Sequence, residues 1–355
     1  MPMDAQTLYG DYPNLKEVKK ILVIKLRQLG DVLLTSPVFS GLKAQMPGAK
    51  IDAYVYSGAI PLLEGHSAIN ECIGYDRNCK KQSWIKKILY EVALLRRIRG
   101  QKYDLVLNLT EGDRGAIASK FSGARIRVGF DPKGSGFVGK KNLYTHVVKQ
   151  SASLRHTVER NLDALRRIGI FPTESERSLH LHVPEDLMAK MRAIAGSEFI
   201  LIHPTSRWKF KCWPEDKMRQ LVQILIARGH SIVFTSGPDP DEIGMVANIA
   251  KDLKCLNLAG RLELKELAAL IQLSKQLICV DSLPLHMACA LQKPVLAIFG
   301  PTSDVTWGPW RNPQAKVIAQ SFSCRPCYQD GCGGSKRSEC LTTLSVEAVL
   351  HALDR

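Results

Sequence analysis

The chain has 355 residues, of which 45% are hydrophobic. This length exceeds that of one ordinary α/β core and suits two domains. Residues 1–20 contain no apolar signal segment, and no uninterrupted apolar run approaches the ~20 residues that cross a bilayer. We therefore expect a cytoplasmic chain that can at most lie on a membrane surface.

The charge is strongly basic and unevenly distributed. The formal net charge is +15, and the first 180 residues hold 29 Lys and Arg against 17 Asp and Glu. A basic surplus favours a polyanionic partner, such as nucleic acid, an anionic membrane or an acidic glycolipid. A solvated cationic surface without a partner is the alternative.

The front half alternates short β-branched runs with segments of helical period. The runs lie at 21–26, 51–56, 105–108 and 125–129, a pattern typical of a parallel sheet with crossover helices. Residues 84–99 repeat apolar side chains at helical spacing, and Lys and Arg flank them. They predict a basic amphipathic helix, for which membrane attachment and an ordinary surface role remain equally open.

A polar stretch, 171–184, follows a predicted helix at 156–167. We place the domain boundary there, which gives domains 1–178 and 179–355. The back half alternates again, with strands at 198–203, 231–235, 255–258, 277–280 and 295–298 and helices at 217–227, 241–251 and 264–273. The sequence thus predicts two α/β domains that face each other across a cleft.

Two common nucleotide-binding classes are disfavoured. Neither half has G-x-G-x-x-G after its first strand, and the chain contains no G-x4-G-K-[ST]. A dinucleotide-dependent dehydrogenase and a P-loop NTPase therefore do not fit.

Asp31 is the candidate catalytic residue of the front half. It follows Gly30, just past the first strand and before a helix expected to begin near Val32. Ligands of open parallel sheets gather beyond the carboxyl ends of the strands. A carboxylate there can act as a general base, and helix N-capping is the alternative.

In the back half, polar residues that suit a pyrophosphate follow the predicted strands. Thr205, Ser206 and Lys211 come after the strand that ends at His203, and hydroxyls with an ammonium group are the donors that phosphates take. Asp281 follows the strand 277–280, and N-capping of the next helix is the alternative role for it. That helix starts at Ser282, with His286 one turn later, and its N-terminus favours an anion. Asp239 is a loop acid suited to ribose hydroxyls, with a solvated loop acid as the alternative.

Four cysteines near the C-terminus form the pattern Cys324-x2-Cys327-x4-Cys332-x7-Cys340. Four thiols with glycines and a proline between them can build a structural zinc site. The last spacing is wider than in a compact knuckle, so free thiols are the preferred interpretation and zinc the alternative.

Taken together, the motifs resemble those of the ADP-heptose:lipopolysaccharide heptosyltransferases, glycosyltransferase family 9. The matching segments are residues 24–37, 203–214, 280–286 and 299–302, and the likeness extends from about Lys20 to the C-terminal helix. The resemblance implies a GT-B fold, with two Rossmann-like domains, the acceptor held by the front one and the nucleotide sugar by the back one. The cysteine-rich tail is most similar to the branch that adds the third, side-branch heptose of the inner core.

The resemblance also implies roles for individual residues. Asp31 corresponds to the catalytic carboxylate of an inverting displacement, and Arg27 with Gln28 to the acceptor side. The donor side comprises Thr205, Ser206, Lys211, Asp239, Asp281, Ser282, Leu283 and His286. Leu283 departs from the family, which usually has glycine there, and its Cβ limits how closely the backbone can approach a phosphate. The implied reaction needs no resident cofactor or catalytic metal.

Other functions remain as alternatives. The nearest is addition of the first or second heptose on the same fold. A different class is a basic nucleic-acid-binding protein with a zinc knuckle, but aromatic residues are only 7% of the chain and Tyr328 is alone within the cysteine cluster. Interleaved aromatics and a defined reading motif would be expected of that class. The implied partners are therefore ADP-heptose, the lipopolysaccharide inner core and the cytoplasmic face of the inner membrane, without nucleic acid.

Overall fold

The computed structural model describes residues 11–81, 83–151 and 153–354. The chain divides between His182 and Val183 into two compact units, inside the polar stretch in which the sequence places a boundary. Each unit contains one six-stranded parallel sheet.

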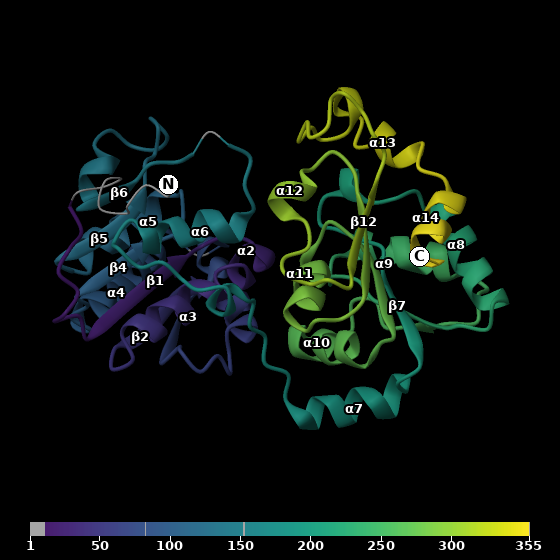
Figure 1. The fold of residues 1–355 in the computed structure, drawn as a ribbon, viewed down its shortest axis with the longest axis horizontal. Coiled ribbons are helices and arrows are strands. Elements are labelled where there is room, and N and C mark those ends of the chain that lie inside the picture. The colour runs from purple at the N-terminus through teal and green to yellow at the C-terminus, as the bar shows by residue number, and fades with distance from the viewer. Residues whose placement is uncertain (1–10, 82, 152, 355) are drawn as a thin grey trace. The chain divides into compact units, whose positions relative to one another are not determined.

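Unit 1 has the strand order β3-β2-β1-β4-β5-β6 (Figure 1). Its strands are β1 (Lys20–Lys25), β2 (Lys50–Tyr56), β3 (Glu71–Tyr75), β4 (Leu105–Asn108), β5 (Ile126–Phe130) and β6 (His146–Val148). Its helices are α2 (Leu29–Leu33), α3 (Ser36–Gln45), α4 (Trp84–Gly100), α5 (Asp113–Phe121) and α6 (Thr157–Arg166). Short 3₁₀ helices lie at Ser57–Leu62, Arg77–Lys81, Lys140–Leu143 and Ser175–Arg177.

Unit 2 repeats this topology with the order β12-β11-β10-β7-β8-β9. Its strands are β7 (Phe199–His203), β8 (Ser231–Phe234), β9 (Leu256–Asn257), β10 (Gln276–Val280), β11 (Val295–Phe299) and β12 (Ala315–Ala319). Its longer helices are α7 (Glu185–Ala195), α8 (Glu215–Ala227), α9 (Pro240–Ala250), α10 (Leu264–Leu273), α11 (Leu283–Ala290) and α14 (Val346–Asp354). The shorter ones are α12 (Asp304–Trp307), α13 (Glu339–Thr342) and the 3₁₀ turns Lys209–Lys211 and Cys332–Gly334.

Helices cover both faces of each sheet because the central strands are apolar on both sides. In unit 2, Ile202 and Val280 point to the face that α8, α9 and α14 cover, and they share one buried cluster with Leu221, Val246 and Val349 from those helices. In unit 1, α4 and α5 pack on the face that carries Leu22 and Val106. The cores therefore hold each sheet rigidly between two helical layers.

In both sheets, successive strands are added first on one side of the first strand and then on its other side. This switch point lies between β1 and β4 in unit 1 and between β7 and β10 in unit 2. The loops that leave two such strands diverge to opposite faces and open a crevice at their carboxyl ends. Asp31 follows β1, whereas Thr205 and Asp281 follow β7 and β10, so the main candidate residues lie at switch points.

Candidate functional site

Asp31 lies in the first turn of α2, but it does not cap the helix. The N-cap position is Gln28, because the helix begins at Leu29, earlier than the sequence predicts. The N-capping alternative for Asp31 is therefore wrong. No hydrogen bond to the Asp31 carboxylate is recorded within the described residues, and the side chain is half-buried. The carboxylate oxygens of Asp31 can therefore accept a hydrogen bond from a ligand.

Lys25, at the end of β1, is a feature that the sequence analysis missed. Its side chain is buried, and Nζ donates to the carbonyl of Leu109 at 3.0 Å and to Oδ1 of Asn161 at 3.1 Å. Burial lowers the pKa of Lys25 to about 8, while the nearby negative charge of Asp31 acts in the opposite direction. A buried cation thus lies beneath the candidate base.

Hydrogen bonds on both sides of helix α2, which carries Asp31, fix its position. Asn161 of α6 also donates from Nδ2 to the carbonyl of Leu34, directly after α2. The backbone N–H of Leu26 donates to Oγ1 of Thr110 at 2.8 Å, which joins the exits of β1 and β4. These contacts fix the position of α2 at the switch point. Arg27 and Gln28 precede it on the exposed side of the loop.

In unit 2, Asp281 joins three strand exits. Its Oδ2 accepts from Nζ of Lys211 at 2.7 Å and from Oγ1 of Thr302 at 2.6 Å. These residues follow β10, β7 and β11, and Asp281 is only 5% exposed. A charge-assisted bond to a buried carboxylate holds Lys211 in place. Because an ammonium group carries three donors, Lys211 retains others for a ligand.

The helix that follows Asp281 starts one residue later than the sequence predicts. Its N-cap is Ser282, so the capping alternative for Asp281 is also wrong. Leu283 is the first helical residue, and its side chain is half-buried. His286 is buried one turn further along α11. The open backbone donors of this helix start therefore lie beside the Lys211–Asp281 pair.

Thr205 is engaged by a residue that the sequence analysis did not select. Its Oγ1 donates to Oε2 of Glu242 at 2.6 Å, and the same oxygen accepts from the backbone N–H of Gly237 at 3.2 Å. Asp239 instead caps α9 and accepts from the N–H of Asp241 at 3.0 Å. Of the two acids, Glu242 is the one in contact with Thr205. Only the topology, which brings α9 to the exit of β7, reveals it.

The segment between β7 and α8 is anchored by Trp213. This side chain is completely buried, and Nε1 donates to the carbonyl of Leu344 at 3.2 Å. Ser206 lies earlier in the segment, where its Oγ accepts from the N–H of Trp208 at 3.4 Å. His203 is buried as well, and burial lowers its pKa to about 4. Its Nδ1 lies 3.0 Å from Oγ1 of Thr235.

The four C-terminal cysteines are free thiols in different environments. Cys340 is buried, Cys327 half-buried, and Cys324 and Cys332 exposed. Burial raises the pKa of Cys340, and the other three thiols of the pattern add to this effect. The backbone N–H of Glu339 donates to Sγ of Cys332 at 3.3 Å. In the described segments, no group of three or more His, Cys, Asp or Glu side chains has an arrangement that could hold a metal ion.

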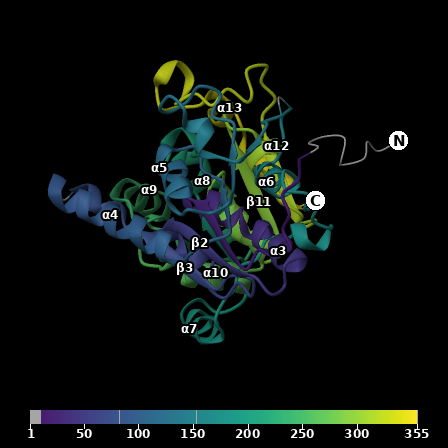
Figure 2. The ribbon, with the colours of Figure 1, turned by 90° about the vertical axis from the view of Figure 1, so that its left-hand side faces the viewer.

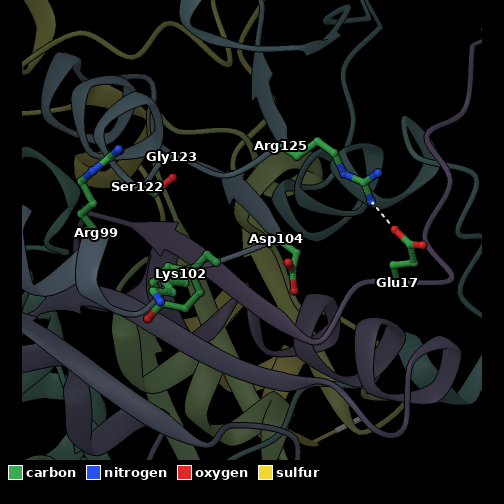
Figure 3. Close-up of a pocket in the computed structure, with 8 residues that line it drawn as sticks. Glu17, Arg99, Lys102, Asp104, Ser122, Gly123 and Arg125 are labelled. Carbon is green, nitrogen blue, oxygen red and sulfur yellow. Dashed lines mark ion pairs between the residues drawn. The ribbon is translucent and has the colours of Figure 1, made fainter.

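A surface pocket in unit 1 lies at the end of the strands opposite to Asp31. Figure 3 shows its lining residues, among which Arg125 forms an ion pair with Glu17 at 3.8 Å. Lys102, Asp104 and Gly123 precede β4 and β5, so the pocket is at the amino ends of the strands. Asp31 lies beyond the carboxyl end of β1. This pocket therefore plays no part in the candidate site.

Comparison with known proteins identifies similar chains. The sequence profile of glycosyltransferase family 9 (heptosyltransferase) matches residues 92–336. Two Escherichia coli proteins called lipopolysaccharide heptosyltransferase 3 are 35% and 32% identical, over 85% and 93% of this chain and 89% and 96% of their own. Lipopolysaccharide heptosyltransferase 2 of E. coli K12 is 27% identical over 84% of this chain and 87% of its own.

Solved structures match the fold across both units. The family 9 glycosyltransferase from Veillonella parvula gives a TM-score of 0.80 at 22% identity, covering 95% of this chain and 96% of its own. The E. coli heptosyltransferase WaaC, solved with ADP, gives a TM-score of 0.75 at 21% identity, and the match covers 94% of this chain and 99% of its own. The predicted fold class, α/β of the GT-B type with two parallel sheets, is therefore confirmed. Neither the family nor these relatives supports the nucleic-acid alternative.

Proposed function

The chain belongs to glycosyltransferase family 9, the heptosyltransferases, and from this premise we propose that it transfers L-glycero-D-manno-heptose from ADP-heptose to a heptose of the lipopolysaccharide inner core. The acceptor step is the third, side-branch heptose. The observation that carries this choice is the identity of 35% and 32% to two proteins called heptosyltransferase 3. The relative called heptosyltransferase 2 is 27% identical, so addition of the first or second heptose remains the alternative.

The donor is held at the switch point of unit 2. Lys211 supplies an ammonium group and Ser206 a hydroxyl for the diphosphate, and the start of α11 at Ser282 and Leu283 adds backbone donors. Thr205 adds its hydroxyl when the O–H turns from Glu242 to a phosphate oxygen. Asp281 positions Lys211 through the 2.7 Å contact and, with His286, borders the heptose and phosphate site. The WaaC structure with ADP supports a nucleotide ligand for this fold.

The nucleotide ribose has two candidate acids. Carboxylates accept hydrogen bonds from vicinal hydroxyls, and both Asp239 and Glu242 lie after β8. Asp239 accepts from the N–H of Asp241 at the start of α9, whereas Glu242 contacts Thr205 at the exit of β7, which borders the switch point. This geometry favours Glu242 and leaves Asp239 as the second candidate.

Asp31 is the proposed general base. It accepts the proton of the acceptor hydroxyl while that oxygen attacks the anomeric carbon, and ADP leaves from the opposite face with inversion. An Asp carboxylate is a weak base, but the hydroxyl becomes acidic as its oxygen forms the new bond. Lys25 places a positive charge near Asp31, and the two groups interact electrostatically. Arg27 and Gln28, just before Asp31, are placed to contact the acceptor.

The positive groups of unit 2 stabilise the leaving diphosphate. Negative charge on ADP grows as the glycosidic bond breaks, and preorganised donors act most strongly where charge develops. Lys211 and the N–H groups at the start of α11 meet this requirement without a resident cofactor. We assign no catalytic role to the cysteine pattern at 324–340, whose segment packs beside the site and donates from the N–H of Cys327 to the carbonyl of Pro301 at 3.0 Å.

The reaction takes place at the cytoplasmic face of the inner membrane. None of the helices in the described part of the chain combines the length and apolar character that crossing a bilayer requires. The proposed acceptor is an amphiphilic glycolipid, so its heptoses stay close to the membrane surface. A strongly basic front half supports peripheral attachment to that anionic surface.

Release of ADP tests the proposed transfer directly. The protein is mixed with ADP-heptose and a lipopolysaccharide that ends in two core heptoses, and ADP is followed by a coupled assay. ADP is expected only when donor and acceptor are both present. Equal rates with ADP-glucose, or no ADP from ADP-heptose, would contradict the proposal.

A further inference from the structure

Helix α4 in unit 1 exposes a row of large apolar side chains. Figure 2 shows one end of this helix projecting beyond the rest of the unit. The exposed fractions are 70% for Trp84, 52% for both Ile85 and Ile88, 62% for Leu89 and 37% for Val92. Isolated exposed apolar residues are ordinary on protein surfaces, but a contiguous group marks an interaction surface.

These residues do not belong to the face with which α4 packs on the unit. Leu94 and Ile98 make that contact, and both are buried in the cluster of unit 1. Successive helical residues are rotated by about 100°, so the middle of the exposed row lies about 130° from Leu94 and Ile98 around the helix. The helix therefore has two apolar faces. One stabilises the core, and the other, defined by Trp84, Ile85, Ile88, Leu89 and Val92, is the outer face.

The charges on α4 indicate the kind of partner that the outer face binds. The helix carries one acid, Glu91, which forms an ion pair with Arg114 at 2.8 Å and so is neutralised by the unit itself. Arg96 is exposed. Around the helix axis it lies about 120° from Trp84, within the range of angles that the outer face covers. The helix carries five cations, Lys86, Lys87, Arg96, Arg97 and Arg99. Of these, Arg97 forms an ion pair with Glu71, and Arg99 donates to the carbonyl of Phe121 at 3.3 Å.

We infer that the outer face of α4 binds the surface of an anionic lipid bilayer. A basic helix with an apolar face lies in the interface plane, with its apolar side chains among the acyl chains and its cations at the lipid phosphates. Tryptophan prefers this boundary, because its ring is apolar and its N–H is polar. A second copy of the chain is a poorer partner, since two such faces would bring like charges together. This inference deepens the membrane attachment proposed above and rests on it.

Vesicle sedimentation tests the inference with the full-length protein. Vesicles of phosphatidylethanolamine are prepared with and without phosphatidylglycerol, and the bound fraction is measured at low and high salt. The wild type is expected to bind the anionic vesicles, with weaker binding at high salt. The variant Ile88→Ser/Leu89→Ser should bind them roughly tenfold more weakly, because two side chains no longer enter the apolar layer.

A matched control separates the outer face from general surface hydrophobicity. Phe171→Ser/Ile194→Ser removes two side chains that are 50% and 46% exposed outside α4, and it should bind like the wild type. Equal binding by the Ile88→Ser/Leu89→Ser variant and the wild type would overturn the inference. A shift from dimer to monomer in that variant, with unchanged vesicle binding, would also overturn it and assign the face to a second copy.

Enzyme assays distinguish failure of this inference from failure of the proposed function. Transfer to an acceptor dispersed in detergent should be the same in the wild type and in Ile88→Ser/Leu89→Ser, whereas transfer to an acceptor embedded in anionic vesicles should fall in the variant. If the wild type transfers heptose to neither acceptor, the proposed reaction fails while the vesicle result still decides the membrane face. Equal transfer by both proteins to the embedded acceptor would contradict the role of α4.

Discussion

Nζ of Lys211 lies 2.7 Å from Oδ2 of Asp281, although 70 residues separate them in the sequence. The pair forms because β7 and β10 are neighbours at the switch point of unit 2. Burial of the acid and its second bond to Thr302 leave the ammonium little freedom. The fold thus orients one cation towards the crevice before any ligand arrives.

Lys211→Ala should weaken ADP binding. A hydrogen bond between a charged group and a phosphate contributes about 1.5–3 kcal/mol, which corresponds to roughly 10- to 100-fold in the dissociation constant. Calorimetric titration with ADP measures it. The control is Lys209→Ala, which removes an exposed cation from the same segment and should change the affinity little. Unchanged affinity in Lys211→Ala would remove Lys211 from the donor site.

Asp31→Asn should abolish transfer and leave ADP binding intact. The amide cannot accept the proton of the attacking hydroxyl, and loss of a general base lowers rates by about 10²- to 10⁴-fold. The turnover number and the ADP dissociation constant are both measured. Asp113→Asn is the matched control, because Asp113 also lies in the first turn of a helix in unit 1. Parallel loss of activity and ADP affinity in Asp31→Asn would indicate a structural role.

Stability should rise with pH above about 8 because of Lys25. Its pKa is about 8 in the folded protein and 10.5 in its ordinary state, so the unfolded chain binds more protons between these values. The unfolding free energy therefore increases across this window, by about 3 kcal/mol in total. Lys25→Met should lack this increase. Denaturant titrations of both proteins from about pH 7 to about pH 9.5 measure the difference, and parallel curves would refute the shifted pKa.

Trp213→Phe should destabilise the protein by about 1–2 kcal/mol, since it removes a buried hydrogen bond and part of a packed ring. The cost stays moderate because Nζ of Lys217 also donates to the carbonyl of Leu344, at 2.8 Å. Urea unfolding measures the loss. Trp208→Phe, at a position that is 49% exposed, should stay within about 0.5 kcal/mol of the wild type. Equal stability of both variants would show that Trp213 does not anchor the segment.

The central strands and the edge strand β9 could be predicted from the sequence, whereas the edge strands β3, β6 and β12 could not. Residues 21–24 and 295–298 are continuous apolar runs, which are typical of buried parallel strands. The sequence analysis missed β3, β6 and β12. Strand β6 has three residues, and every residue of β12 is only half-buried, so neither presents a strong apolar pattern.

The candidate site shows a similar limit. Motif spacing identified the strand exits and most polar residues at them, but it could not say which side chains meet. Lys25 looks like an interruption of an apolar strand, and Glu242 like a surface residue of a helix. Their contacts with Asn161 and Thr205 depend on the packing of α6 and α9 against other elements. Both N-capping alternatives failed for a local reason, since the helices begin at Leu29 and Leu283.

Mass spectrometry of defined acceptors tests the central claim most directly. Lipopolysaccharides with no, one or two core heptoses are incubated with the protein and ADP-heptose, and the mass of each acceptor is measured. The account predicts the gain of one heptose on the two-heptose acceptor alone. Gain on a shorter acceptor would contradict the assignment to the third heptose, and gain on none would contradict heptosyl transfer itself.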